Sequence, residues 1–582
     1  MKIKLAKTAG FCMGVHRAVE IVLDVAAKHR PPIYTFGPLI HNPQVLEILA
    51  EKGISILKDP AHTAPGSVVI RAHGVPPETK ELLIDAGFSV IDATCPRVIK
   101  VQNIIGRHAK RGSAVVIVGD RRHPEVAGLL GFAQGRGYVI RDPDDVKTLP
   151  DLKHVIVVAQ TTQDARRFQA VAEAVLARFP DARVFNTICD STHKRQAEVR
   201  EMAHDVDAVI VVGGQNSGNT RRLVQVAEQE GVRAFHIETE SEIDSEAVAP
   251  LKTVGITAGA STPNWVIKKV YRTLESLPHR QQAGWRQGLY RLQRWLLLSN
   301  TYLALGAGCL SYTFALLSGI PPGLPPALMA TCYVLSMHIL NNFTGKEAVR
   351  YNDPDRAQFY EEHKTLLLSL AVVSGGLGLF MAFKLGPVPF FVLVLISVLG
   401  LLYNVTLFAR GITMGRKITR ISDIPGSKTV LIAMAWGVVT VVVPHLAVSL
   451  QVTTTVVFSA LLAAVLAFVR TAFFDILDMQ GDRLVGHESL PLVIGKEKSL
   501  RLLKQLLILS LAVLLFAPVM KLTTSLANGL ILTVFYLAWV VQAFDKHWIV
   551  PGFRFEFLVE SVFVLTAGIA GIWHLFFYSP QI

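Results

Sequence analysis

Three cysteines stand in similar local sequences, and thiolates bind soft metals and act as nucleophiles. They are Cys12 in GFCMGVH, Cys95 in ATCP and Cys189 in TICDST, 83 and 94 residues apart. Each precedes a helical pattern and is expected at a helix N-terminus, where the dipole favours the thiolate. Three thiolates can hold an iron–sulfur cluster, and a four-iron cubane then keeps one iron without a protein ligand. Zinc is the competing metal, although its sites usually use close Cys-x-x-Cys pairs, and inert buried cysteines are the alternative without function.

Polar side chains recur in a constant order around these cysteines. Strand-like runs end at Gly37, Gly119 and Gly213, and a histidine or serine stands four residues beyond each glycine. A second strand-like run in each unit ends beside another polar residue. Landmarks that recur in one order predict a threefold repeat of α/β units over residues 1–275. The polar landmarks are His41, His73, His123, Thr161, Ser217 and Ser261, together with the amide of Asn219, two residues after Ser217.

The elements expected around these residues bring them together at one site. Short Val/Ile runs alternate with helical patterns, which is typical of βαβ units with parallel sheets, whose ligands bind at the carboxyl ends of strands. Imidazoles, hydroxyls and an amide suit a phosphate or diphosphate, and the glycine-rich run 213–220 could add a backbone nest. Glu125, two residues beyond His123, is the candidate proton donor. Taken singly, such residues are more often helix caps, core residues or surface carboxylates.

The chain changes character after residue 274. Residues 276–295 are rich in arginine and are predicted to form a linker with an interfacial helix, and residues 296–582 a transmembrane domain. Most of about nine apolar runs can cross a hydrocarbon core of about 30 Å. The expected fold is therefore an N-terminal α/β domain of three repeated units and a C-terminal all-α polytopic membrane bundle. The runs are 296–319, 327–340, 366–385, 388–407, 430–448, 456–474, 506–520, 526–544 and 557–578, of which the second and seventh are short as counted.

The net charge of +13 mostly reports membrane topology. Basic residues concentrate in alternate loops between the apolar runs, so the positive-inside rule places these loops and the α/β half in the cytoplasm. This distribution argues against a nucleic-acid partner and leaves contact with the anionic lipid bilayer open. No signal peptide is expected, and five scattered cysteines do not form a disulfide framework. The expected location is the inner cell membrane, as a multi-pass protein with its α/β domain cytoplasmic.

The N-terminal motifs resemble 4-hydroxy-3-methylbut-2-enyl diphosphate reductase, of the non-mevalonate isoprenoid pathway, over residues 1–275. The resemblance implies a [4Fe-4S] cluster on the three cysteines, and Glu125 as the proton donor. It implies diphosphate contacts from His41, His73, Ser217, Asn219 and Ser261, with His123 and Thr161 near the substrate alcohol. The stretches that carry it are AGFCMGVHRAVE, GPLIHNPQV, IRAHGVPPE, DATCPRV, GDRRHPEV, AQTT, NTICDST, GGQNSGNT and TAGASTP.

One position departs from that family. Gly218 stands where many members carry a second serine, and a backbone amide could replace the hydroxyl. The family's reaction uses two electrons and yields isopentenyl and dimethylallyl diphosphate. Because no flavin or nicotinamide fingerprint is present, a ferredoxin or flavodoxin is the expected electron donor.

A polar motif follows the sixth apolar run. Asp475, Asp478 and Asp482 stand at i, i+3 and i+7 on one helix face, and such a cluster suits Mg²⁺ bridging a diphosphate. The motif RTAFFDILDMQGDR, with LPL and GK after it, resembles the intramembrane prenyltransferases of the 4-hydroxybenzoate polyprenyltransferase type, a nine-span family, over about residues 295–580. That family's first acidic motif, N-D-x-x-D, is NNFTG here (residues 341–345). Active prenyl transfer and a retained scaffold or membrane anchor both remain open.

Two other hypotheses compete with a membrane-tethered enzyme acting on isoprenoid diphosphates. A redox sensor could use the cluster to control the membrane half, but it would not need the polar ring. A transporter would place charges near the middle of the membrane rather than at one face.

Overall fold

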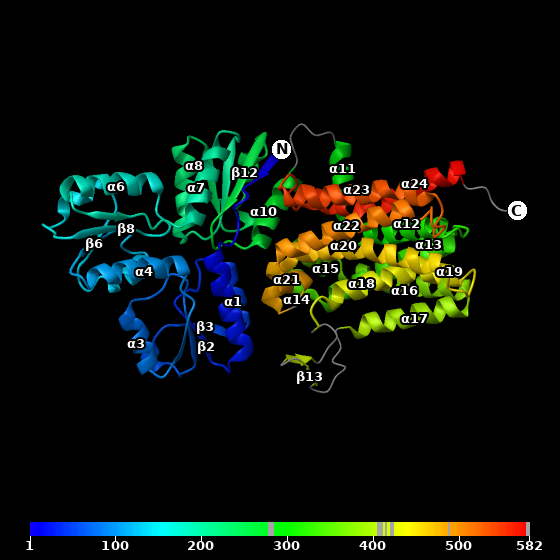
Figure 1. Cartoon of the computed structure of the whole chain (residues 1–582), viewed down its shortest axis with the longest axis horizontal. Helices are drawn as coiled ribbons and strands as arrows, with labels where there is room; N and C mark the ends of the chain where they lie inside the picture. Colours follow the sequence, from blue (N-terminus) through cyan, green and yellow to red (C-terminus); the bar gives the residue numbers. More distant parts are fainter. Residues whose placement is uncertain (278–283, 404–410, 414–415, 419–423, 487–488, 578–582) are drawn as a thin grey trace. The chain divides into compact units, whose positions relative to one another are not determined.

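The computed structural model divides into two compact units, Met1–Arg280 and Gln281–Ile582, each of which is described by itself (Figure 1). The structure describes residues 1–277, 284–403, 411–413, 416–418, 424–486 and 489–577. The first unit is an α/β structure with parallel sheets, and the second is a helical bundle.

The α/β unit contains three four-stranded parallel sheets, in the orders β3-β2-β4-β5, β7-β6-β8-β9 and β1-β12-β10-β11. The repeated sheet order agrees with the predicted threefold repeat. The strands are β1 (Lys2–Leu5), β2 (Ile33–Phe36), β3 (Ile54–Leu57), β4 (Ser67–Ile70), β5 (Ser89–Asp92), β6 (Ala114–Val118), β7 (Gly137–Ile140), β8 (Val155–Ala159), β9 (Arg183–Phe185), β10 (Ala208–Val212), β11 (Arg233–Ile237) and β12 (Thr253–Ala258).

The first strand corrects the expected unit boundaries. Because Ile3 to Leu5 precede Cys12 in the chain, sequence order predicts a strand of the first repeat there, but β1 pairs in parallel with β12 and so completes the third sheet. A strand's own residues do not encode its partner, because register and neighbour are set by the folded sheet. The chain thus begins in the third sheet and passes through Cys12 into the first.

Helices cover both faces of the central strands. In β6, Val116 and Val118 pack with α6, whereas Val115 and Ile117 pack with α4 and α5. Strands buried on both faces account for the continuous Val/Ile runs in the sequence. The helices are α1 (Met13–Lys28), α2 (Pro43–Glu51), α3 (Pro77–Asp85), α4 (Pro96–Ala109), α5 (Pro124–Gly131), α6 (Ala165–Arg178), α7 (Asp190–Ala203), α8 (Gly218–Gln229), α9 (Ser245–Val248) and α10 (Asn264–Ser276).

The helical unit is a ring of packed helices. α12 packs between α13 and α24; from α13 the ring continues through α16, α17, α19 and α18, and from α24 through α23, α22 and α20, which packs on α18. The helices are α11 (Gly284–Leu298), α12 (Thr301–Leu317), α13 (Leu324–Thr344), α14 (Lys346–Asn352), α15 (Pro354–Glu362), α16 (Lys364–Leu385), α17 (Pro387–Leu402), α18 (Ser427–Gly437), α19 (Val443–Leu446), α20 (Thr454–Val485), α21 (Leu490–Ile494), α22 (Lys496–Phe516), α23 (Leu526–Asp545) and α24 (Phe553–Phe577).

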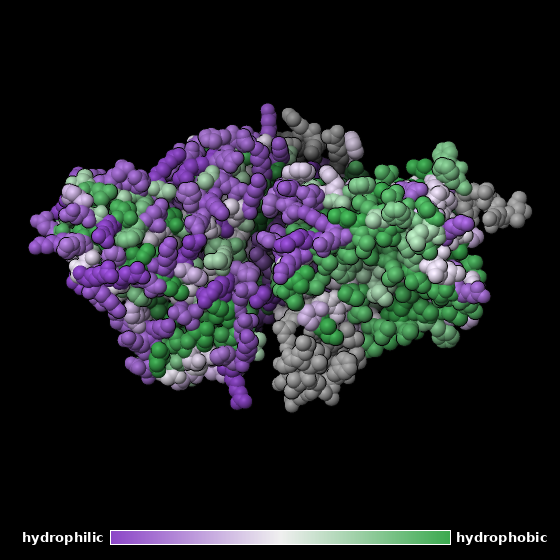
Figure 2. All heavy atoms as spheres, in the orientation of Figure 1, coloured by the Kyte–Doolittle hydropathy of each residue, from purple (hydrophilic) through white to green (hydrophobic). Residues whose placement is uncertain are grey.

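Six segments of the described helical unit are long and apolar enough to cross a membrane, and each overlaps a predicted apolar run. They are Lys364–Leu385, Ser427–Leu446, Thr454–Val485, Lys496–Phe516, Leu526–Asp545 and Phe553–Phe577. The seventh run, 506–520 and short as counted, overlaps α22, which begins earlier at Lys496 and ends at Phe516. The face of this unit seen in Figure 2 is largely hydrophobic. Apolar side chains as exposed as Val372 (71%) and Phe391 (68%) are expected for a lipid-facing surface.

The expectation of an all-α second unit is wrong in one detail. Residues Gly411–Thr413 (β13) and Arg416–Ile418 (β14) form a two-stranded antiparallel ribbon. Both strands carry β-branched residues, which favour extended backbone, and they lie in a loop that the hydropathy pattern treats only as a connection.

Candidate active site

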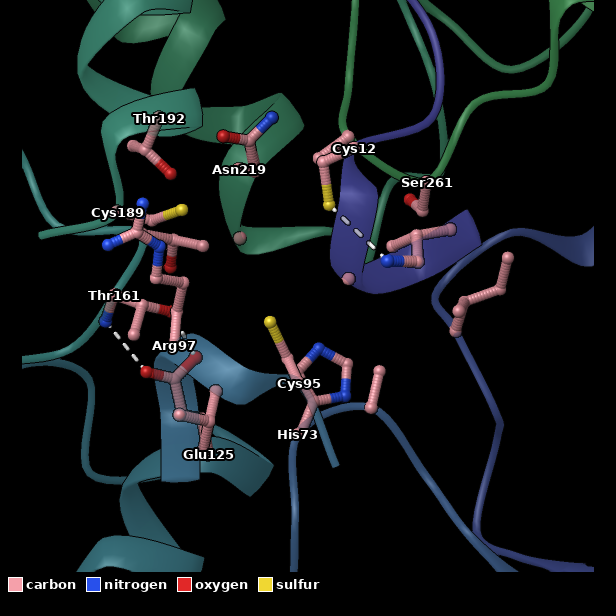
Figure 3. A pocket seen from close by; sticks show the side chains of 18 of the residues that line it. Cys12, His73, Cys95, Arg97, Glu125, Thr161, Cys189, Thr192, Asn219 and Ser261 are labelled. Carbon is pink, nitrogen blue, oxygen red and sulfur yellow. Dashed lines mark hydrogen bonds between the residues drawn. The ribbon is translucent and has the colours of Figure 1, made fainter. Parts of the chain in front are cut away.

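The three cysteines line one cavity of the α/β unit, and their sulfur atoms point toward its centre (Figure 3). Cys12, Cys95 and Cys189 are the N-cap residues of α1, α4 and α7. Their backbone N–H groups donate to the carbonyl oxygens of Ala260, Ala72 and Thr161, which lie two residues beyond β12, β4 and β8. The predicted helix N-terminal placement of the thiols is therefore confirmed.

Gly14 keeps space beside two of the thiols. A Cβ atom on Gly14 would lie 2.4 Å from Cys95 Sγ and 3.9 Å from Cys12 Sγ. Burial raises the pKa of the Cys95 thiol, so an uncompensated thiolate is disfavoured there. Three thiols around one space, with a glycine where any side chain would collide, fit an iron–sulfur cluster.

The polar landmarks lie around the same cavity. His123 and Ser217 are the N-caps of α5 and α8, and His41 directly precedes the N-cap of α2. His73, Thr161 and Ser261 follow strands β4, β8 and β12. The structure thus brings together every residue of the predicted ring, at the carboxyl ends of the central strands.

The three histidines form a compact group of neutral imidazoles. The ring centres of His41 and His73 are 4.7 Å apart, and His123 lies 5.9 and 5.3 Å from them. Burial, with smaller contributions from Arg71 and Arg221, lowers the pKa of His41; burial, the neighbouring His41 and then other charges lower that of His123 to about 4. Burial and the neighbouring charges also hold the pKa of His73 well below its usual value.

These imidazoles could hold a metal ion, because their nitrogens lie within 4.8 Å of one another. An anion fits better, because Arg71 and Arg221 are close enough to repel a cation electrostatically. Several buried polar atoms of the ring have no hydrogen-bond partner among the described residues: His41 Nε2, His73 Nδ1 and both amide atoms of Asn219. Buried polar groups without partners indicate a polar ligand.

The start of α8 adds backbone donors to the ring. Ser217 accepts a hydrogen bond from the Thr220 N–H at 3.3 Å, and Gly218 is the first residue of the helix. A Cβ on Gly218 would lie 3.3 Å from His123 Nε2, so a serine there would press on the imidazole. A helix N-terminus with glycine at its first position is suited to an anion.

Glu125 is a buried carboxyl group held by one partner residue. It is 1% exposed, and its two oxygens accept hydrogen bonds from the Thr161 N–H at 2.6 Å and the Thr161 hydroxyl at 2.8 Å. Burial raises the pKa of Glu125, and the two hydrogen bonds offset part of this rise. A carboxyl group with a raised pKa beside the thiols can hold and deliver a proton.

Sequence reasoning missed several polar residues that line the cavity, among them Arg97 and Thr192. They stand two residues after Cys95 and three after Cys189, on the first turns of α4 and α7. Once each cysteine is placed at a helix N-terminus, polar residues in the next turn become site candidates, and this spacing was the available signal.

The three aspartates of the helical unit share a face of α20, as predicted, and contact other helices there. Thr429 Oγ1 donates to Asp475, and Asn352 Nδ2 donates to Asp482 Oδ1 at 2.7 Å. Lys428 is near enough to interact electrostatically with all three aspartates. Three carboxylates on one face fit a divalent cation, which would bind them alongside their contacts with Thr429, Asn352 and Lys428.

The region of the missing first acidic motif forms the end of α13. Asn342 donates its amide to the Tyr360 hydroxyl at 3.0 Å, and Asn300 donates to the same oxygen at 2.8 Å. Asp353 instead pairs with Arg356 at 3.2 Å. An amide (Asn342) and a glycine (Gly345) therefore stand where the resemblance leads one to expect carboxylates, and this half of a two-part metal site does not fit.

Comparison with known proteins separates the two units. Residues 3–275 match the model of the LytB protein family. The 4-hydroxy-3-methylbut-2-enyl diphosphate reductase of Solidesulfovibrio magneticus is 45% identical over 286 residues, 47% of this chain and 100% of that protein. The chain belongs to the 4-hydroxy-3-methylbut-2-enyl diphosphate reductase family. The reductase of Geobacter sulfurreducens is 42% identical, covering 49% of this chain and all of that protein. A solved structure of (E)-4-hydroxy-3-methyl-but-2-enyl diphosphate reductase is 39% identical, with a TM-score of 0.38, and covers 47% of this chain and 99% of that one.

The helical unit carries a UbiA prenyltransferase domain, matched by that family's model over residues 361–578. The matched range begins after the NNFTG stretch at residues 341–345. A UbiA homologue from Archaeoglobus fulgidus, solved bound to GPP and Mg²⁺, is 12% identical with a TM-score of 0.36, covering 48% of this chain and 98% of that one. The chain is thus a reductase domain fused to a prenyltransferase-type membrane domain.

Proposed function

We propose that residues 1–275 reductively remove the hydroxyl group of (E)-4-hydroxy-3-methylbut-2-enyl diphosphate. The allylic C–O bond breaks, two electrons and two protons are consumed, water leaves, and isopentenyl and dimethylallyl diphosphate form. The observation that supports this most strongly is a single cavity lined by three thiols, a buried carboxyl group and the polar ring.

Cys12, Cys95 and Cys189 would hold a [4Fe-4S] cluster in this cavity, in agreement with the family. When bound, such a cluster supplies a Lewis-acidic iron for the alcohol oxygen and delivers electrons. No flavin or nicotinamide motif occurs in the sequence, so a ferredoxin or flavodoxin would be the source of those electrons.

The chain's own residues would bind the diphosphate and supply a proton. His41, His73, Ser217, Asn219 and Ser261, with the amide of Gly218, would contact the diphosphate. Binding of a polyanion favours the charged form of an imidazole, so neutral histidines would take up protons as the substrate binds. His123 and Thr161 would lie near the alcohol, and Glu125 would protonate the departing hydroxyl.

This function is tested by anaerobic turnover of the full-length protein with the hydroxybutenyl diphosphate and a chemical reductant. We expect an iron–sulfur absorbance band, both products, and loss of both band and products in Cys95→Ser. Cys309→Ser, in the helical unit, is the matched control and should behave as wild type. Full turnover in Cys95→Ser would eliminate the cluster assignment.

We also propose that the second unit is a nine-span domain of the inner cell membrane. Besides the six long spans, α12, α13 and α17 correspond to the three remaining apolar runs. Basic loops would face the cytoplasm and keep the reductase domain, residues 1–275, on that side. Residues 276–295 would be an interfacial linker, because α11 exposes Trp285 67%, Leu289 57% and Leu292 53% on one face. Residues 278–283 of this linker lie outside the described residues.

For the membrane domain, residues 296–582, we propose prenyl transfer from an isoprenoid diphosphate. Asp475, Asp478 and Asp482 would hold Mg²⁺ and, through it, the diphosphate. The experiment is product analysis from vesicles supplied with prenyl diphosphates and candidate acceptors, with Asp475→Ala as the variant and Asp545→Asn, in a half-exposed ion pair with Lys504, as the control. Identical products from wild type and Asp475→Ala would instead support a membrane anchor.

A further inference from the structure

One arginine of each helix that begins at a thiol (α1, α4 and α7) contacts the loop that carries another of the three thiols. Arg17 of α1 donates Nη1 to the carbonyl oxygen of Thr94 at 3.0 Å, directly before Cys95. Arg97 of α4 forms an ion pair with Asp190, directly after Cys189. The contacts run from the first cysteine to the second and from the second to the third.

The third arginine closes the circle. Arg195 of α7, six residues after Cys189, donates Nη2 to the carbonyl oxygen of Gly10 at 2.6 Å, two residues before Cys12. Its Nη1 donates to the carbonyl oxygen of Ala258 at 3.0 Å, at the end of β12. The spacing from cysteine to arginine differs among the three helices, so this arrangement is visible only in the folded chain.

We propose that Arg17, Arg97 and Arg195 form an arginine ring that fixes the three thiol loops to one another and places positive charge beside the cluster. The thiols are 83 and 94 residues apart and follow three different sheets, so their separations depend on contacts between repeats. The planar guanidinium group, with several donors in fixed directions, is well suited to join two backbone segments.

The burial of Arg195 supports its electrostatic role. It is 3% exposed, and it donates hydrogen bonds to the Ser191 hydroxyl and to the carbonyl oxygens of Ala258 and Gly10, all of them uncharged. The groups close to it that can carry negative charge are the Cys12 thiol, Glu198 and the Cys189 thiol. A buried guanidinium group is costly without compensating negative charge, which thiolates holding a cluster supply. Positive charge beside a cluster also stabilises its reduced form and raises its reduction potential.

The three positions should differ in importance. Arg195 is buried and joins two segments, whereas Arg17 is half-buried and joins one. The Arg97 and Asp190 side chains are 43% and 65% exposed, and exposed ion pairs contribute little. We therefore expect effects to decrease in the order Arg195, Arg17, Arg97.

The test compares full-length variants purified anaerobically in detergent. In Arg195→Gln, iron should pass to a chelator roughly tenfold faster, which corresponds to about 1.4 kcal/mol, and the cluster midpoint potential should become more negative. Arg195→Lys should restore the cluster midpoint potential, because lysine keeps the positive charge. It should not restore iron retention, because it lacks the planar guanidinium group that donates to two carbonyl oxygens. Arg178→Gln is the control, since Arg178 also donates to two carbonyl oxygens, of Val146 and Leu149, at 2.6 Å each, away from the thiols.

The role of the arginine ring in iron retention rests on the proposed function, and a second measurement tests the ring independently of that function. Iron-free protein is titrated with Cd²⁺, whose thiolate absorbance reports whether the three thiols are held together. Weaker Cd²⁺ binding in Arg195→Gln and Arg17→Gln supports the ring even if the wild type turns over no substrate. Wild-type iron retention, potential and Cd²⁺ affinity in Arg195→Gln, or equal losses in Arg178→Gln, would overturn it.

Discussion

Replacing Glu125 by glutamine separates proton delivery from the architecture of the site. The wild-type carboxyl oxygens accept from the Thr161 N–H at 2.6 Å and the Thr161 hydroxyl at 2.8 Å. The amide of Glu125→Gln keeps one oxygen for the N–H, and its NH₂ can donate to the hydroxyl oxygen. Both contacts survive, so the free energy of unfolding should change by less than about 1 kcal/mol.

The kinetic effect should be large by comparison. A positioned general acid contributes about 10²–10⁴ in rate, equivalent to roughly 2.7–5.5 kcal/mol of transition-state stabilisation. We therefore expect kcat of Glu125→Gln to fall by about 10²–10⁴, with iron content, cluster absorbance and KM close to wild type.

The pH profile provides an independent check. The folded-state pKa of Glu125 is raised by burial, so the carboxyl group keeps its proton above the usual range and loses it as pH rises through the raised value. Wild-type kcat should show a basic limb from this loss, and the limb should disappear in Glu125→Gln. Thr161→Val removes a hydrogen bond to the carboxylate and should move the limb to higher pH.

Anaerobic stopped-flow kinetics with a reduced electron donor, combined with iron analysis, measures these quantities together. A kcat of Glu125→Gln within threefold of wild type at full iron content would remove this residue from the proton path. A parallel loss of iron and activity would show that the residue supports the cluster instead.

Four further predictions concern the histidines of the ring and two closely packed glycines. Inorganic pyrophosphate should bind with proton uptake, because the pKa of His123, about 4 in the free protein, must rise beside the anion. Its affinity should increase by up to about tenfold per proton and per pH unit as pH falls from 8 to 6. Calorimetry in buffers of different ionisation enthalpy measures the proton uptake, and no uptake would contradict the prediction. For the free protein, a depressed histidine pKa means that stability is present above about pH 6.5 and is lost as pH falls toward 4, which acid unfolding checks. Gly14→Ala should lose most of its iron without losing helical circular dichroism, since its Cβ would lie 2.4 Å from Cys95 Sγ; full iron content would refute the close packing. Gly481→Ala should lower the melting temperature of the membrane unit in detergent. The added Cβ would fall on the Asn352 amide oxygen and disrupt that contact, at a cost of about 1–3 kcal/mol. An unchanged melting temperature would show that α14 packs differently.

Local sequence patterns were sufficient for much of the architecture. Short Val/Ile runs correspond to the central strands, and the cysteines cap helices, because side-chain periodicity and helix-start signals act within a few residues. Each of the six long apolar segments overlaps a predicted apolar run, since crossing a membrane requires length and hydropathy that are read directly from the chain. Three members of the polar ring were found because they stand four residues beyond a glycine, and three more because they follow a second strand-like run.

Contacts between distant residues could be decided only by the tertiary structure. β1 completes the sheet of β12, more than 240 residues later, and no property of Lys2–Leu5 specifies that partner. Thr161 holds Glu125, and Asn352 donates to Asp482, through packing across different elements. Arg195 reaches the Cys12 loop only because the third sheet brings Gly10 to it. The sequence alone therefore identified most residues of the candidate site, whereas long-range packing decided which groups hold them in place.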